Sequence, residues 1–276
     1  MTKPRGQRSY EFDPRHLVPM AYDFMRLATV GLMNNKKRQH VIGMGRSIRA
    51  HAFEAWDDLP SVSMDELAGH LGAADEEIAL PPLGALRTAG FGLPSYVVLA
   101  TVTRALKPKK ILEFGTYRGA GTLTMALNAP EAEIVTVDLP GDFQDADVLA
   151  LAKNDKEWAR IARDSVGMVF LEHEVRQRIR MVRENSLTLD ARTIADAVDF
   201  CFIDGGHTYE CVKADTENAL RVIAPTGTIM WDDYAWFAPG VNKYLCEIAE
   251  SRPLLRIAET QYVILPGKNK PISAVA

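Results

Sequence analysis

Short apolar runs alternate with amphipathic segments over the last two thirds of the chain. Apolar runs typical of buried strands lie at 110–114, 134–138, 179–183, 198–204 and 227–231, and helical spacing marks 96–106, 122–127, 209–223 and 240–251. Residues 254–260 and 262–265 predict a terminal antiparallel pair. Strands that alternate with helices predict an α/β fold, in which a mainly parallel sheet carries helices on both faces.

The first 92 residues follow a different pattern. Apolar residues recur at helical spacing over residues 17–30, and residues 61–71 predict a second helix with Glu66 in its first turn. We therefore expect a helical extension over residues 1–92, which covers a substrate pocket or forms a dimer contact, and a sheet domain over residues 93–268.

Residues 141–175 interrupt the alternation of strands and helices. The segment is rich in charged residues and predicts helix, so we interpret it as an insertion near the substrate pocket. Variable loops and insertions around a pocket determine specificity, and for that reason the acceptor substrate is not readable from the sequence.

Composition and charge exclude several classes of protein. A net charge of −4 and a pI of about 5.9 leave no basic excess for binding nucleic acid or an acidic membrane surface. The three cysteines have no paired spacing, which argues against a disulfide framework or a zinc site and favours a reducing cytoplasm. The charged first residues are unlike a signal peptide, and no stretch is apolar enough to span a bilayer.

The segment 110–124, KILEFGTYRGAGTLT, is the most informative stretch. An apolar strand runs into a turn with three glycines, and a helix follows, which is how α/β sheets hold nucleotide-like ligands. A dinucleotide fingerprint requires Gly-x-Gly-x-x-Gly, but the positions read from Gly115 hold Tyr117 and Ala120 instead of further glycines. The pattern Glu-x-Gly-x-x-x-Gly-x-Gly resembles motif I of the class I S-adenosylmethionine (SAM)-dependent methyltransferases.

Polar side chains stand at the predicted carboxyl ends of the strands, where parallel sheets bind ligands. They are Glu113, Asp138, Ser186, Asp204, Asp232 and Asp233. Asp138 closes the second sheet strand at the distance expected for a carboxylate that binds ribose hydroxyls. The alternative is an ordinary turn or helix-cap aspartate.

A second motif strengthens the resemblance. Residues 198–220, VDFCFIDGGHTYECVKADTENAL, and residues 225–234, PTGTIMWDDY, resemble a branch of small class I methyltransferases near the macrocin-type and catechol-type O-methyltransferases. The resemblance covers roughly residues 94–265. It implies a Rossmann-like, doubly wound sheet of seven strands with the last strand antiparallel. It also implies SAM-dependent methyl transfer to a small-molecule hydroxyl.

The resemblance assigns roles to individual residues. The implied SAM-binding residues are Glu113, Gly115, Thr116, Tyr117, Gly119, Thr122, Asp138, Leu139, Ser186, Asp204 and His207. Catechol-type enzymes hold a divalent metal, and the matching positions here are Asp204, Asp232 and Asp233. Three carboxylates repel each other unless a cation joins them, and hard oxygen ligands suit Mg²⁺. The alternative is that Asp232 and Asp233 only bind loop amides.

His207, with Asp204, is the candidate catalytic residue. An imidazole suits proton abstraction near neutrality, whereas macrocin-type enzymes carry an acidic base at the position of Gly206. Alternatively, His207 caps the following helix or contacts the cofactor. We interpret Asp215 and Glu217, further along that helix, as surface charge.

Two other functions remain open at this stage. An iron oxygenase that resembles the cephalosporin hydroxylase group would use His207 with Asp204 and Asp232. A non-catalytic partner protein would keep the fold and bind SAM or a protein. The sequence leaves open the acceptor, the methylated atom, the need for a metal, and whether the N-terminal helices form a homo-oligomer.

Overall fold

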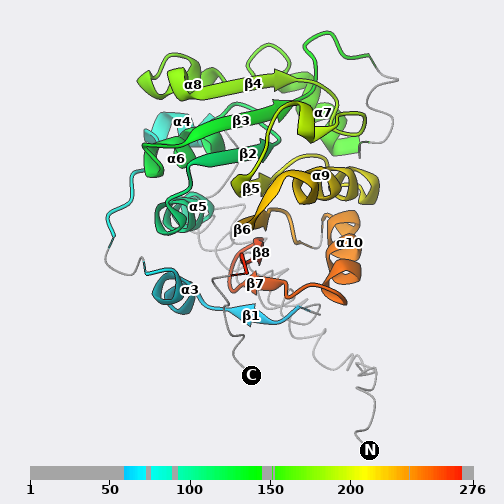
Figure 1. Cartoon of the computed structure of the whole chain (residues 1–276). Helices are drawn as coiled ribbons and strands as arrows, with labels where there is room; N and C mark the ends of the chain where they lie inside the picture. Colours follow the sequence, from blue (N-terminus) through cyan, green and yellow to red (C-terminus); the bar gives the residue numbers. More distant parts are fainter. Residues whose placement is uncertain are drawn as a thin grey trace, which may run out of the picture. The chain divides into compact units, whose positions relative to one another are not determined.

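The computed structural model describes residues 59–72, 76–88, 93–144, 151, 153–235 and 237–268 (Figure 1). The chain divides into two compact units, 1–56 and 57–276, and all described residues belong to the second. The helix predicted over residues 17–30 and most of the proposed oligomer contact therefore lie outside the described residues.

A mixed sheet forms the centre of this unit (Figure 1). Its strands are β1 (Ser61–Val62), β2 (Lys110–Phe114), β3 (Glu133–Asp138), β4 (Ile179–Arg183), β5 (Val198–Ile203), β6 (Ile223–Trp231), β7 (Leu255–Ile257) and β8 (Val263–Leu265), in the spatial order β1-β7-β8-β6-β5-β2-β3-β4. All neighbouring pairs are parallel except those of β8, which runs antiparallel to β6 and β7.

Helices cover both faces of the sheet. They are α3 (Met64–Leu71), α4 (Leu83–Thr88), α5 (Leu93–Leu106), α6 (Ala120–Asn128), α7 (Lys153–Ala162), α8 (Met168–Leu171), α9 (Tyr209–Val222) and α10 (Pro239–Ala249). Within β2, Ile111 packs in a buried cluster with residues of α5 and α6, whereas Leu112 packs in a second cluster with residues of α9 and α10. Successive strand residues point to opposite faces, so the two clusters confirm the doubly wound α/β fold.

The strand prediction was correct for the parallel strands and for the antiparallel last strand, but the described sheet has eight strands rather than seven. The extra strand is β1, which lies in the segment predicted as helical extension. Its backbone bonds β7 through Arg256 N–H to Pro60 O (2.8 Å) and Ala258 N–H to Val62 O (2.9 Å).

The helix predicted over residues 61–71 begins at Met64 because Ser63 caps it. The Ser63 hydroxyl oxygen accepts from the Glu66 N–H, and the Glu66 carboxylate accepts from the Ser63 N–H at 2.9 Å. Glu66 therefore lies in the first turn as predicted. No helix among the described residues is both long and apolar enough to cross a bilayer.

The parallel strands bring their carboxyl ends to one edge of the sheet. Backbone bonds continue past the strands, from Gly115 N–H to Val137 O (2.9 Å), from Asp204 N–H to Phe114 O (2.8 Å) and from Asp232 N–H to Ile203 O (2.9 Å). These bonds fix the ends of β2, β3, β5 and β6 next to one another, so that their loops can share one site.

Candidate functional site

A cavity of about 330 Å³ lies at this edge of the sheet. Of the residues predicted to bind SAM, those that line it are Gly115, Tyr117, Asp138, Leu139, Ser186, Asp204 and His207. Helix α7 supplies a further wall through Asp155, Trp158, Ala159 and Ala162. Part of the predicted insertion therefore borders the cavity.

Gly115 lets two strand-end loops approach each other closely. Its φ is +94°, and a Cβ atom built there would lie 1.8 Å from the carbonyl oxygen of Asp204. Gly119 (φ +88°) precedes α6, and a Cβ there would lie 2.5 Å from a ring carbon of Phe170. Any side chain at Gly115 would separate the loops after β2 and β5.

Glu113 lies beneath this loop rather than in the cavity. It is buried, and its Oε2 accepts hydrogen bonds from the hydroxyls of Thr122 and Thr136, both at 2.5 Å. The Thr136 hydroxyl is also hydrogen-bonded to that of Thr116 at 2.6 Å. Burial raises the pKa of Glu113 to about 8, although the two hydroxyls oppose this shift. Glu113, Thr116 and Thr122 thus support the loop from below, and none of them lines the cavity.

Asp138 holds the start of the glycine loop. Its Oδ2 accepts from the Tyr117 N–H and its Oδ1 from the Leu139 N–H, each at 2.7 Å. Arg183 donates to the Leu139 carbonyl at 2.6 Å and lies near the carboxylate. Burial raises the pKa of Asp138 above its usual value. The hydrogen bonds from backbone N–H groups and the charge of Arg183 limit this shift.

Arg118 follows Tyr117 in the loop, and its guanidinium lies 5.5 Å from the centre of the Tyr117 ring. Trp158 of α7 meets the same ring edge-on, with 6.1 Å between ring centres. Half of the Trp158 surface is exposed, so this side chain forms the outer rim of the cavity.

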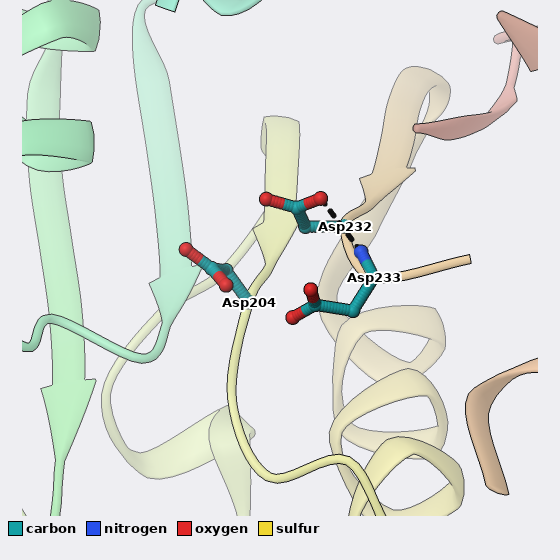
Figure 2. A group of neighbouring side chains, drawn as sticks. All are labelled: Asp204, Asp232 and Asp233. Carbon is teal, nitrogen blue, oxygen red and sulfur yellow. Dashed lines mark hydrogen bonds between the residues drawn. The ribbon is translucent and has the colours of Figure 1, made fainter. Parts of the chain in front are cut away.

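Three carboxylates converge beside the cavity, as predicted (Figure 2). Asp204, Asp232 and Asp233 each offer an oxygen, and these oxygens all lie within 4.8 Å of one another. Asp232 and Asp233 are buried, while Asp204 is partly exposed. Burial, and then mutual repulsion, raise the pKa of Asp204 and of Asp232 well above the usual range.

The hydrogen bonds of Asp232 are incomplete. Its Oδ1 accepts from the Asp233 N–H at 2.6 Å, as the amide-binding alternative predicts (Figure 2). Its Oδ2, however, is buried, and none of the residues that the structure describes forms a hydrogen bond with it. A buried carboxylate oxygen without a partner, beside two further carboxylates, fits a divalent cation with oxygen ligands.

His207 lies between two carboxylates. Its Nδ1 is hydrogen-bonded to Asp155 and its Nε2 to Asp233, and its backbone N–H donates to the second oxygen of Asp155 at 2.8 Å. Burial alone would lower the pKa of His207, but the bonds from Asp155 and Asp233 raise it to about 11. Neither ring nitrogen is free to accept a proton or to bind iron in this arrangement.

Sequence reasoning missed two residues of the site. Asp155 lies in the insertion, where nothing local connects it to His207. Asp215 was expected on the surface, and this was wrong: it is only 1% exposed and lines the cavity. The missed signal was spacing, since Asp215 stands four residues after Cys211 and four before Ala219, on the buried face of α9. Glu217 is half-buried and pairs with Lys213 and Arg221.

Residues 112–234 match the family model Methyltransf_24, described as a methyltransferase domain. A curated relative, an uncharacterized protein y4gI from Sinorhizobium fredii, is 26% identical over 157 residues. That alignment takes in 56% of this chain and 16% of the relative, so the chain spans a small part of that protein's length.

Solved structures with a similar fold include a putative O-methyltransferase from Klebsiella pneumoniae, at 18% identity and a TM-score of 0.44, over 73% of this chain and 87% of that one. Another is the O-methyltransferase TomG from Streptomyces achromogenes in complex with SAM, at 14% identity and a TM-score of 0.44, over 80% of this chain and 98% of that one. At these scores the structural similarities are weak.

Proposed function

From the methyltransferase-domain match over residues 112–234, we propose that the chain is a SAM-dependent methyltransferase that methylates a hydroxyl of a small molecule. One observation carries the proposal. A single cavity combines the glycine loop, the strand-end Asp138 and the edge of the carboxylate cluster Asp204, Asp232 and Asp233. Such a cavity can place a nucleoside cofactor next to a group that activates an acceptor.

The residues of the cavity divide between two tasks. Asp138 stands where a carboxylate binds ribose hydroxyls, and Gly115 and Tyr117 bring the loop backbone close to the ligand. Asn185 and Ser186 border the space for the base. When bound, SAM supplies an electrophilic methyl group. The protein aligns this group with the acceptor oxygen and excludes water.

The carboxylate cluster would hold Mg²⁺ through Asp204, Asp232 and Asp233, and the partnerless oxygen of Asp232 supports this assignment. When bound, such a cation lowers the pKa of a hydroxyl that it coordinates.

His207 then has a positioning role in place of the predicted role as base. Both of its ring nitrogens are already hydrogen-bonded to carboxylates, so it holds Asp233 in place through one of them. Proton removal from the acceptor falls to the carboxylates of the cluster, of which Asp204 and Asp233 line the cavity. The same bonds disfavour the oxygenase, because iron would need a free ring nitrogen of His207.

Calorimetry tests this proposal. SAM is titrated into the protein with Mg²⁺ and then with EDTA, and the titration is repeated with Asp138→Ala and with Asp142→Ala, whose side chain is exposed outside the cavity. We expect saturable binding that Asp138→Ala weakens about 100-fold or more and that Asp142→Ala retains. Absence of SAM binding in both conditions would overturn the proposal and leave the non-catalytic, protein-binding alternative.

An acceptor screen follows from the same preparation. Phenols, catechols and sugar hydroxyls are incubated with SAM, with and without Mg²⁺, and product S-adenosylhomocysteine is measured. Turnover with a hydroxyl acceptor is the expected result. SAM binding without turnover on any hydroxyl, but with turnover on an amine or carbon acceptor, would refute O-methylation alone.

A further inference from the structure

Asp215 is a buried carboxylate whose hydrogen bonds are incomplete. The residue is 1% exposed, and its Oδ1 is buried and has no hydrogen-bond partner within the described part of the chain. The Ser186 hydroxyl is hydrogen-bonded to the carboxylate, and burial raises the pKa of Asp215 to about 7. Because buried polar atoms nearly always have a hydrogen-bond partner, this oxygen indicates that Asp215 binds a ligand.

The surrounding backbone is shaped to admit the carboxylate. A Cβ atom on Gly205 would lie 2.6 Å from Asp215 Oδ2, so only glycine allows the two to come so close. The loop that carries Ser186 is tied to α9 separately, since the Asn218 side-chain amide donates to the Ser186 carbonyl at 3.1 Å. Asn218 therefore joins α9 to this loop through a hydrogen bond that does not involve Asp215.

Asp215 and Asp138 line the same cavity from different elements. Under the proposed function, Asp138 binds the ribose hydroxyls, and the remaining strong hydrogen-bond donor of the nucleoside is the amino group on its base. Asp215 lines the cavity together with Ser186, and its carboxylate is an acceptor for such a donor. We infer that Asp215 selects the cofactor's base by accepting a hydrogen bond from the 6-amino group of adenine.

This inference rests on the proposed function and adds a specificity residue to it. A site built around a hydrogen bond discriminates strongly against an analogue that lacks the group, since its own polar atom is then left buried and unpaired. Asp215 is the candidate for such discrimination because its Oδ1 has no hydrogen-bond partner among the described residues.

The experiment compares two ligands by calorimetry. They are S-adenosylhomocysteine and its counterpart with unsubstituted purine, which lacks only the 6-amino group. We expect the wild-type protein to bind the adenine form about 10- to 100-fold more tightly. In Asp215→Ala the ratio should fall below about threefold, because the acceptor is gone. Glu217→Gln, a change on the same helix but outside the cavity, should keep the wild-type ratio.

Asp215→Asn gives a second, nearly isosteric variant. Its amide oxygen can accept from Ser186, which turns the NH₂ group toward the base, and the preference for the 6-amino group should disappear or reverse. Circular dichroism checks that each variant is folded. If neither variant folds, equal binding of the two ligands by the wild-type protein still overturns the inference.

Failure of the inference about Asp215 can be distinguished from failure of the proposed function. Equal binding of both ligands by the wild-type protein overturns the inference and leaves the proposed function standing. A wild-type ratio retained in folded Asp215→Ala overturns it as well. Binding of neither ligand by the wild-type protein removes the proposed function and the inference together.

Discussion

Asp155 binds His207 at two points, the backbone N–H and the ring Nδ1, although the residues stand 52 positions apart in the chain. Asp155 belongs to α7 and His207 to the loop after β5, so this pair fastens the wall of the cavity to the loop that carries Asp204. The helix is otherwise strongly charged and presents Trp158 and Ile161 to solvent. Much of its attachment therefore depends on one buried carboxylate.

We predict that Asp155→Ala loosens α7 and weakens ligand binding. Removing one partner of a buried charged pair costs about 3 kcal/mol, and the affinity for S-adenosylhomocysteine should fall about tenfold as the wall opens. Urea unfolding, calorimetry and limited proteolysis of α7 measure these effects. Glu157→Ala, on the exposed side of the same helix, is the control and should change none of them. Resistance of α7 to protease in Asp155→Ala would contradict the prediction.

Gly115→Ala should prevent the loops after β2 and β5 from packing. The new methyl group would lie 1.8 Å from the Asp204 carbonyl oxygen, at a φ of +94° that alanine resists. We expect a loss of about 3 kcal/mol or more in the free energy of unfolding. Gly69→Ala is a matched control, because α3 has open space at that position and alanine favours helix, so stability should rise slightly. Equal stability of the two variants would refute this account of the loop.

Asp232→Asn should distinguish two effects of the carboxylate cluster on stability: repulsion between the carboxylates without metal, and stabilisation by bound Mg²⁺. Without metal, the variant should be at least as stable as the wild-type protein, since one of three repelling charges is gone. Mg²⁺ at 100 times its dissociation constant should stabilise the wild-type protein by about 2.7 kcal/mol and the variant much less. Thermal unfolding with and without Mg²⁺ measures both effects. Asp164→Asn, an exposed carboxylate elsewhere, should behave as wild type, and an unchanged Mg²⁺ shift in Asp232→Asn would exclude the cluster as the metal site.

Glu113 should make stability decline with rising pH. Its pKa is about 8 in the folded protein against 4.5 in the unfolded chain, so between these values the folded state binds one more proton. The resulting contribution is fully present below pH 4.5 and is lost as pH rises through 8, at about 1.4 kcal/mol per pH unit.

Glu113→Gln removes this dependence, because a neutral amide still accepts the hydroxyls of Thr122 and Thr136. Urea unfolding at pH 5.5, 7 and 8.5 should show a flatter profile for the variant than for wild type. Glu133→Gln, on the exposed start of β3, is expected to leave the profile unchanged. Parallel profiles for Glu113→Gln and wild type would mean that Glu113 is already ionised in the folded protein.

The sequence was most informative where a strand and the candidate site residues at its end lie in one short segment. The bounds of β2 and β4 match the prediction because each of these short strands is followed directly by a glycine or a polar residue. The carboxylate cluster was also predicted, because parallel strands necessarily bring their ends together. β1 was missed because two residues are too few to show a period, and its partner β7 lies far away in the chain.

Roles that depend on contacts between distant segments were not readable. Whether His207 is a base or a held cation is decided by Asp155, and no local pattern connects them. The resemblance left open whether Glu113 positions the ligand or the loop itself, and its side chain turns under the loop to Thr122 and Thr136. Alternation along a strand predicts which face of the sheet a side chain lies on. The role of the side chain depends on its hydrogen bonds, which the alternation does not predict.

The short strand β1 changes where the methyltransferase-like unit can be cut. A fragment that starts at residue 93, the boundary that the sequence suggests, would lose β1 and α3 together. The backbone N–H groups of Arg256 and Ala258 that now bond to residues 60 and 62 would then face solvent along an open strand edge. Such edges recruit strands from other molecules, so a fragment that begins before residue 59 should stay monodisperse where the shorter one aggregates.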